Sequence, residues 1–144
     1  MHDTFGLSRF LQAQRPVLSQ VMAELRSGRK TTHWMWFIFP QLQGLARSEI
    51  ANRYAISGVG EARAYLAHDV LGPRLEDCIR TVLQHRNASA MQIFGSPDDM
   101  KFRSCLTLFA YVQPGSAVYQ QALDQFYSGE PDGKTLSLLG EGLR

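Results

Sequence analysis

The sequence predicts an all-α fold, a single compact bundle of about six to eight helices with no sheet. Apolar residues recur three or four positions apart along most of the 144-residue chain, which is the spacing of one helix face. The densest apolar run, Trp34–Phe39, has no comparable second segment to pair with, and a lone strand is not stable. The length fits one domain, which we assign to residues 1–144.

The first third of the chain contains two helices and the aromatic run. A short helical pattern begins at Leu7 and is interrupted at Pro16, because proline disfavours helical geometry in the residue before it. The second helix ends at Gly28, and its apolar face follows helical spacing with Leu18, Val21, Met22 and Leu25. We interpret Trp34–Phe39 as helical and expect Pro40 to stop it.

Three further helices are predicted in the middle of the chain. Ser48–Tyr54 forms a short helix, and Ser57–Gly60 has the composition of a linker. Two helices follow, with a break between them near His68–Gly72. The second of these carries a long apolar stripe that consists of Leu71, Leu75, Cys78, Ile79 and Val82.

The last third contains a helical turn and two longer helices. Ala88–Phe94 forms the turn, and the sequence from Ser96 to Asp99 then predicts a helix start, with serine as the N-cap, proline in the first position and two acids in the first turn. That helix continues to Pro114, and the final full helix carries Val118 to Phe126. We expect the remaining residues, including Thr135–Leu139, to form a short tail after the turn at residues 129–133.

Composition and charge exclude several classes of protein. The formal net charge is +2, and basic residues do not gather in a stripe, so we expect no specific nucleic-acid binding. No apolar run reaches the length of a membrane span, and the N-terminus lacks the regions of a signal peptide, so we expect no membrane association and a cytoplasmic protein. The two cysteines, Cys78 and Cys105, are expected to be free thiols.

Motifs for metals and cofactors are missing from the sequence. The four histidines are scattered, and no pair of cysteines has the spacing of a zinc site. There is no P-loop, no dinucleotide-binding glycine motif and no G-x-S-x-G sequence. We therefore expect no metal and no cofactor. No pattern in the sequence predicts the oligomeric state.

Several motifs resemble one known family over nearly the whole chain. The run His33–Gln41, followed by Gly44 and Leu45, is similar to the hallmark of the DUF1810 family, whose function is unknown. The other matching segments are Phe10–Gln14, Glu61–Ala62, Tyr65–Leu66, Leu71–Gly72, Arg74–Leu75, Phe94–Gly95, Asp99–Ser104 and Thr107–Phe109. Cys105 departs from the pattern, because family members often carry a serine there. The resemblance implies an all-helical fold and no established activity or cofactor.

Polar residues flank the aromatic run and form a first group of candidate site residues. His33 is the candidate catalytic residue, because a histidine can act as a general base near neutral pH. Lys30 is a candidate anion contact, and the rings of Trp34 and Trp36 are candidates for stacking on a ligand. The amide of Gln41 is suited to recognising polar ligand groups.

Lys101 and Ser104 form a second group of candidates. Both lie on one side of the first two turns of a predicted helix, where free backbone N–H groups, a lysine and a hydroxyl can hold a phosphate. Asp98 and Asp99 compete for the same positive helix end. The alternative explanation is an ordinary capped helix with a solvated face.

These residues favour a domain that binds a small anionic or nucleotide-like ligand in an aromatic-lined pocket. In one version of this hypothesis, the domain also hydrolyses the ligand. The alternative is a non-catalytic protein–protein interaction module in which the aromatic run is structural core. The polar candidates then bond only to backbone groups, which is the common fate of polar side chains beside dense aromatics. The sequence leaves open whether the protein is an enzyme.

Overall fold

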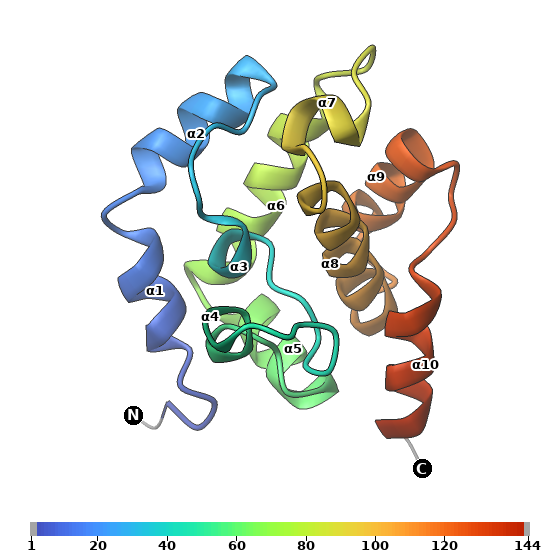
Figure 1. Ribbon diagram of the computed structural model, residues 1–144. Coiled ribbons are helices and arrows are strands. Elements are labelled where there is room, and N and C mark those ends of the chain that lie inside the picture. The colour runs from blue at the N-terminus through green and yellow to red at the C-terminus, as the bar shows by residue number, and fades with distance from the viewer. Residues whose placement is uncertain (1–2, 143–144) are drawn as a thin grey trace.

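The computed structural model describes residues 3–142, and side chains as far as residue 140; all its regular elements are helices (Figure 1). The prediction of an all-α fold is therefore confirmed. The ten helices within residues 3–142 are α1 (Ser8–Gln14), α2 (Leu18–Ser27), α3 (Met35–Ile38), α4 (Glu49–Arg53), α5 (Val59–Ala67), α6 (Leu71–Leu83), α7 (Ala90–Phe94), α8 (Asp98–Val112), α9 (Ala117–Tyr127) and α10 (Gly133–Gly142).

The predicted number of six to eight helices is wrong, mainly at the C-terminus. Residues expected to form a short tail belong to α10. Its first turn is stabilised by Asp132, whose carboxylate accepts hydrogen bonds from the backbone N–H (2.9 Å) and the hydroxyl (2.6 Å) of Thr135. This is N-capping geometry. The glycines at residues 133 and 140 lower the helix propensity of the segment, which hides it from a pattern search.

The start of α8 lies one residue later than its sequence signal indicates. Ser96 was the predicted N-cap, but Pro97 occupies the cap position, with no side-chain cap hydrogen bond, and the helix begins at Asp98. By contrast, α7 has a complete capping box, because Ser89 and Gln92 each accept a hydrogen bond from the other's backbone N–H.

Helix α8 lies at the centre of the fold and packs against α5, α7, α9 and α10 (Figure 1). Its aromatic residues connect the aromatic run to the rest of the core. Phe102 contacts Phe39 with ring centroids 4.9 Å apart and Phe94 with centroids 4.7 Å apart. Such edge-to-face and tilted pairs add stability beyond the burial of their area. The aromatic run thus packs against the face of α8 that carries Phe102, one turn after Asp98 at the start of the helix.

The junction of α5 and α6 is tight. It falls where the sequence predicts a break, and Gly72 lies in the first turn of α6. A Cβ atom on Gly72 would lie 2.1 Å from the carbonyl oxygen of Leu66, so only glycine fits there without a backbone shift.

A short backbone clasp closes the loop between α3 and α5. The N–H of Gln43 donates to the carbonyl of Ile56 (2.7 Å), and the N–H of Ile56 donates to the carbonyl of Gln41 (2.8 Å). These bonds form an isolated parallel bridge, not a strand, and they bring the two ends of the segment 42–56 together. Helix α4 lies inside this segment and has no buried residue.

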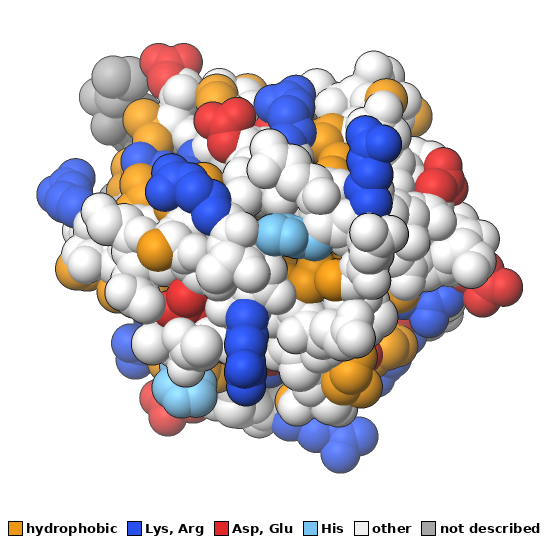
Figure 2. Space-filling view, turned by 90° about the horizontal axis from the view of Figure 1, so that it is seen from above, with side chains coloured by type: hydrophobic (Ala, Val, Ile, Leu, Met, Phe, Trp, Pro, Cys, Tyr) orange, Lys and Arg blue, Asp and Glu red, His pale blue; other side chains and the backbone are white. Residues whose placement is uncertain are grey.

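On the face that Figure 2 shows, lysine and arginine side chains are dispersed among acidic and uncharged ones. Among the described residues, no helix combines the length and the apolar character that crossing a membrane requires.

Candidate functional site

The segment that leads into the aromatic run is fixed by one buried carboxylate. Glu24, on α2, is 4% exposed and accepts hydrogen bonds from the backbone N–H groups of Thr31 (2.6 Å) and Thr32 (3.0 Å). It also accepts from the Thr32 hydroxyl (2.5 Å), the Trp34 indole N–H (3.0 Å) and the Gln20 amide (2.8 Å). We call this group the Glu24 cluster.

The Glu24 cluster stabilises the ionised carboxylate. Burial by itself raises the pKa of Glu24, but the hydrogen bonds from Thr32, Thr31 and Gln20 outweigh it and lower the pKa to about 2. Trp34 is 0% exposed and lies inside the core beside this carboxylate. Its ring therefore offers no face to a ligand in this conformation.

Two lysines share one aspartate where the aromatic run meets α8. The ammonium of Lys30 lies 2.9 Å from Asp98 Oδ2, and the ammonium of Lys101 lies 3.3 Å from Asp98 Oδ1. The Lys30 side chain is 7% exposed and also lies over the Trp34 ring, whereas Lys101 is 26% exposed. We call these three residues the Lys30–Asp98–Lys101 triad.

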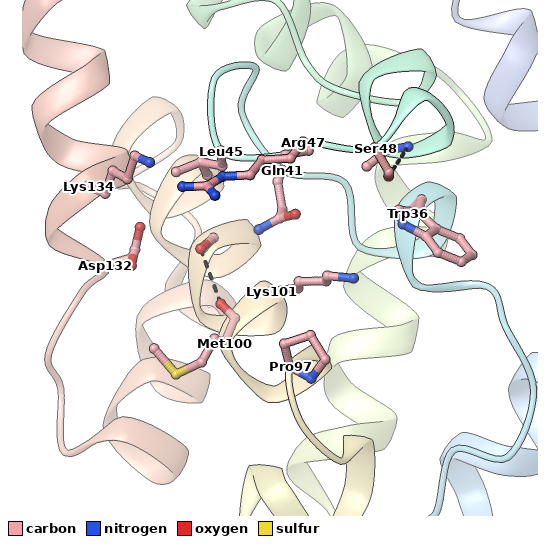
Figure 3. A pocket seen from close by; sticks show the side chains of 13 residues that line it. Trp36, Gln41, Leu45, Arg47, Ser48, Pro97, Met100, Lys101, Asp132 and Lys134 are labelled. Atoms are coloured by element: carbon pink, nitrogen blue, oxygen red, sulfur yellow. Dashed lines mark hydrogen bonds between the residues drawn. The ribbon is translucent and has the colours of Figure 1, made fainter.

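A cavity of about 300 Å³ opens beside the triad (Figure 3). Its walls come from three regions: the aromatic run with the loop and helix that follow it, the first two turns of α8, and the start of α10. The lining residues are Trp36, Gln41, Leu45, Ala46, Arg47, Ser48, Ala51, Pro97, Met100, Lys101, Ser104, Asp132 and Lys134.

Three cationic side chains line this cavity, against one carboxylate. Arg47, Lys101 and Lys134 come from separate parts of the chain, and Asp132 is occupied in capping α10. Arg47 and Lys134 form no ion pair with any of the side chains in residues 3–140. The lining is therefore positively charged.

The ammonium of Lys101 lies 5.4 Å from the centre of the Trp36 ring. This is a cation–π contact, and it holds the lysine against the half-buried tryptophan at one end of the cavity. In Figure 3, Lys134 and Asp132 lie at the opposite end, and the side chains of Gln41 and Arg47 lie between. The buried hydroxyl of Ser104 donates to the carbonyl of Met100 (3.1 Å).

The structure brings four of the seven predicted site residues together: Trp36, Gln41, Lys101 and Ser104 all line the cavity. The other three, Lys30, His33 and Trp34, lie outside its lining. Lys30 is held by Asp98, Trp34 is buried beside Glu24, and His33 is exposed between them. His33 and Ser104 therefore do not form one unit.

Three residues of the site were missed by sequence reasoning. Arg47 and Lys134 look like ordinary surface residues in the sequence, and only the fold places them opposite Lys101. Asp98 was interpreted as a helix-start residue that competes with an anion. The sequence did contain a signal for the Asp98–Lys101 ion pair, because an acid three residues before a lysine lies on the same face of a helix.

Of the other polar side chains, Gln14 is satisfied within the fold, whereas the buried Oδ1 atom of Asp99 has no hydrogen-bond partner. Gln14, another conspicuous amide in the sequence, donates to the Phe37 carbonyl (2.7 Å) and accepts from Arg74 (2.9 Å). Both cysteines are free and buried, and burial raises the pKa of Cys78 to about 12. Within the described residues, no three His, Cys, Asp or Glu side chains gather as metal ligands.

Comparison with known families agrees with the motifs in the aromatic run. A family model described as "Protein of unknown function (DUF1810)" matches residues 4–139. The chain belongs to the DUF1810 family. No protein with a curated description matches it.

A crystal structure shows the same fold as this chain. The conserved hypothetical protein Rv1873 from Mycobacterium tuberculosis, solved at 1.38 Å, is 49% identical to this chain. The similarity covers 96% of this chain and 99% of the other, with a TM-score of 0.94. Both proteins therefore share one helical architecture.

Proposed function

We propose that this DUF1810 protein binds a small anionic ligand, such as a phosphate ester or a nucleotide-like compound, in the cavity beside α8. The observation that supports this most is the meeting of Arg47, Lys101 and Lys134 around one cavity, although they are distant in sequence. Like charges repel, so gathering them around a hollow disfavours the empty state and favours an anion between them.

The chemistry of the lining suits phosphate or carboxylate groups. Arg47 carries a forked guanidinium, which bonds such groups with two parallel N–H donors, and the two lysines act as point charges. Small-molecule sites span about 300–1,000 Å³, so a cavity of about 300 Å³ fits a small metabolite and not a polymer. Gln41 supplies an amide for the uncharged part of the ligand.

Binding is better supported than hydrolysis. The hydroxyl of Ser104 is engaged with the Met100 carbonyl, and His33, the predicted general base, is not part of the lining. We therefore propose a binding role without a hydrolytic step. We also propose a cytoplasmic location, which the two free buried thiols support.

A thermal-shift screen tests the proposal. The panel consists of inorganic phosphate, pyrophosphate, AMP, a sugar phosphate and citrate. A ligand at 100 times its Kd adds about 2.7 kcal/mol of stability, which for a domain near this size raises the Tm by several degrees. We expect at least one phosphate compound to give such a shift.

Variants locate the binding. Arg47→Gln and Lys101→Met are each expected to raise the Kd about tenfold, because a hydrogen bond to a charged group contributes about 1.5–3 kcal/mol. Arg63→Gln is the matched control, since Arg63 is exposed on α5 and does not line the cavity. A panel without any shift, or Arg47 and Lys101 variants that bind like the wild type, would contradict the proposal.

A further inference from the structure

The Lys30–Asp98–Lys101 triad places an internal carboxylate next to a cation of the proposed site. Lys101 lines the cavity, and its ammonium lies 3.3 Å from Asp98 Oδ1. Asp98 itself is not part of the lining. An anion in the cavity and the Asp98 carboxylate therefore attract the same ammonium group from two sides.

Lys30 and Lys101 are unequal partners of Asp98. Lys30 lies closer to the carboxylate, at 2.9 Å, and is nearly buried, with a side chain that is 7% exposed. Its backbone is anchored as well, because the Lys30 N–H donates to the Ile93 carbonyl (2.7 Å). Lys101 is more distant, more exposed and supported by Trp36 on the cavity side. Lys101 can therefore turn toward a ligand while Lys30 continues to compensate the charge of Asp98.

We propose that Asp98 and Lys30 are positioning residues that set the anion affinity of the cavity through Lys101. Asp98 draws the Lys101 ammonium away from the ligand, and Lys30 weakens that attraction because it shares the carboxylate. This inference rests on the proposed function, because it requires that an anion binds beside Lys101. Lys30, which the sequence predicts as a ligand contact, then acts on the ligand indirectly, through Asp98 and Lys101.

The proposal predicts that two substitutions change the Kd in opposite directions. A merely structural role of Asp98 and Lys30 would not produce opposite changes. Asp98→Asn frees Lys101 and should lower the Kd for pyrophosphate or AMP about threefold to tenfold. Lys30→Met leaves Asp98 with Lys101 alone and should raise the Kd about threefold. Isothermal titration with inorganic pyrophosphate and with AMP, on the full chain, measures both.

Double-variant cycles separate this mechanism from a general change of charge. The gain from Asp98→Asn should vanish when Lys101 is already methionine. The loss from Lys30→Met should vanish when Asp98 is already asparagine, whereas a general electrostatic effect would persist unchanged. Glu49→Gln is the charge control, because Glu49 is exposed and directly follows Ser48 of the lining, and it should leave the Kd within about twofold.

The outcomes distinguish this inference from the proposed function. If the wild type binds one of the two probes and Arg47→Gln weakens binding, but Asp98→Asn does not strengthen it, the role of the triad is disproved and the anion site stands. If the wild type binds no compound of the panel, both are contradicted; if it binds a panel compound other than these two probes, that compound replaces them in the titrations. If Lys30→Met does not fold, the Asp98→Asn and Lys101→Met cycle alone decides, because the asparagine side-chain oxygen can still accept a hydrogen bond from the Lys30 ammonium.

Discussion

Similar residues have different roles at the two ends of the aromatic run. At the entry, Glu24 holds Thr31, Thr32 and Trp34 through hydrogen bonds that are complete within the protein. At the exit, Trp36 and Gln41 line a cavity with three cationic groups, of which Arg47 and Lys134 have no acidic partner within residues 3–140.

This difference shows that residue type alone does not identify a site. Each end has a tryptophan with a lysine ammonium over its ring, Lys30 at Trp34 and Lys101 at Trp36, and a polar neighbour. The entry contributes to stability because each donor already has an acceptor inside the fold. The exit is suited to binding because the charges of Arg47 and Lys134 are still available to a ligand. The number of internal partners, not the residue type, separates the two.

The largest effect that the comparison predicts concerns the entry. Glu24→Ala should lower the free energy of unfolding by about 3–5 kcal/mol, because it leaves the buried indole N–H of Trp34 and the part-buried backbone N–H groups of Thr31 and Thr32 without an acceptor. A buried donor without a partner costs about 1–3 kcal/mol. Urea denaturation measures the change. Glu49→Ala, on the exposed helix α4, is the control and should change stability by less than about 0.5 kcal/mol. Equal effects for the two variants would show that the Glu24 cluster is not what stabilises the entry.

A smaller effect of the same cluster is expected at acid pH. The pKa of Glu24 is about 2 in the folded chain, below its ordinary value of 4.5, so the unfolded chain takes up the proton first. The stability that this group confers is therefore complete above pH 4.5 and is lost as the pH falls toward 2, with a total of about 3 kcal/mol. Denaturation curves between pH 6 and about 2.5 should show this decline. Glu24→Gln should flatten it, and an unchanged slope in that variant would assign the decline to other carboxylates.

The smallest predicted effect is a difference in fluorescence quenching between the two tryptophans. Trp34→Phe leaves Trp36 as the only tryptophan, and Trp36→Phe leaves Trp34. Iodide should quench the fluorescence of Trp36 several-fold more than that of Trp34, because Trp34 is fully buried and the cationic cavity attracts the anion to Trp36. Neutral acrylamide should show a smaller difference, since it lacks the charge. Similar iodide quenching in both variants would mean that the exit is as closed as the entry.

Much of the fold could be predicted because its signals are local. The break between α5 and α6 and the stripe of α6 follow directly from residue spacing. Helix α10 was missed because its stability depends on the Asp132 cap and on burial of Leu139, and neither outweighs its glycines in a pattern search. The N-cap of α8 was misplaced because Ser96 and Pro97 match a common start signal that this helix does not use.

The candidate site could be predicted only in part, because it depends on long-range contacts. Trp36 and Gln41 lie within the hallmark of the family, and Lys101 and Ser104 share a helix face, so both pairs were accessible from the sequence. Their meeting with Arg47 and Lys134 requires the packing of α8 against α10 and the path of the loop before α4. No local pattern contains that information.

The backbone clasp between residues 41–43 and 56 has a consequence for the timing of ligand exchange. The segment it closes carries Arg47 and Ser48 of the cavity wall, and the helix within it buries no side chain. Breaking the clasp would release this wall, while the buried face of α8 stays packed. Amide hydrogens of residues 44–54 should therefore exchange with deuterium much faster than those of α8. A bound anion should slow their exchange, so this wall would set the residence time of the ligand.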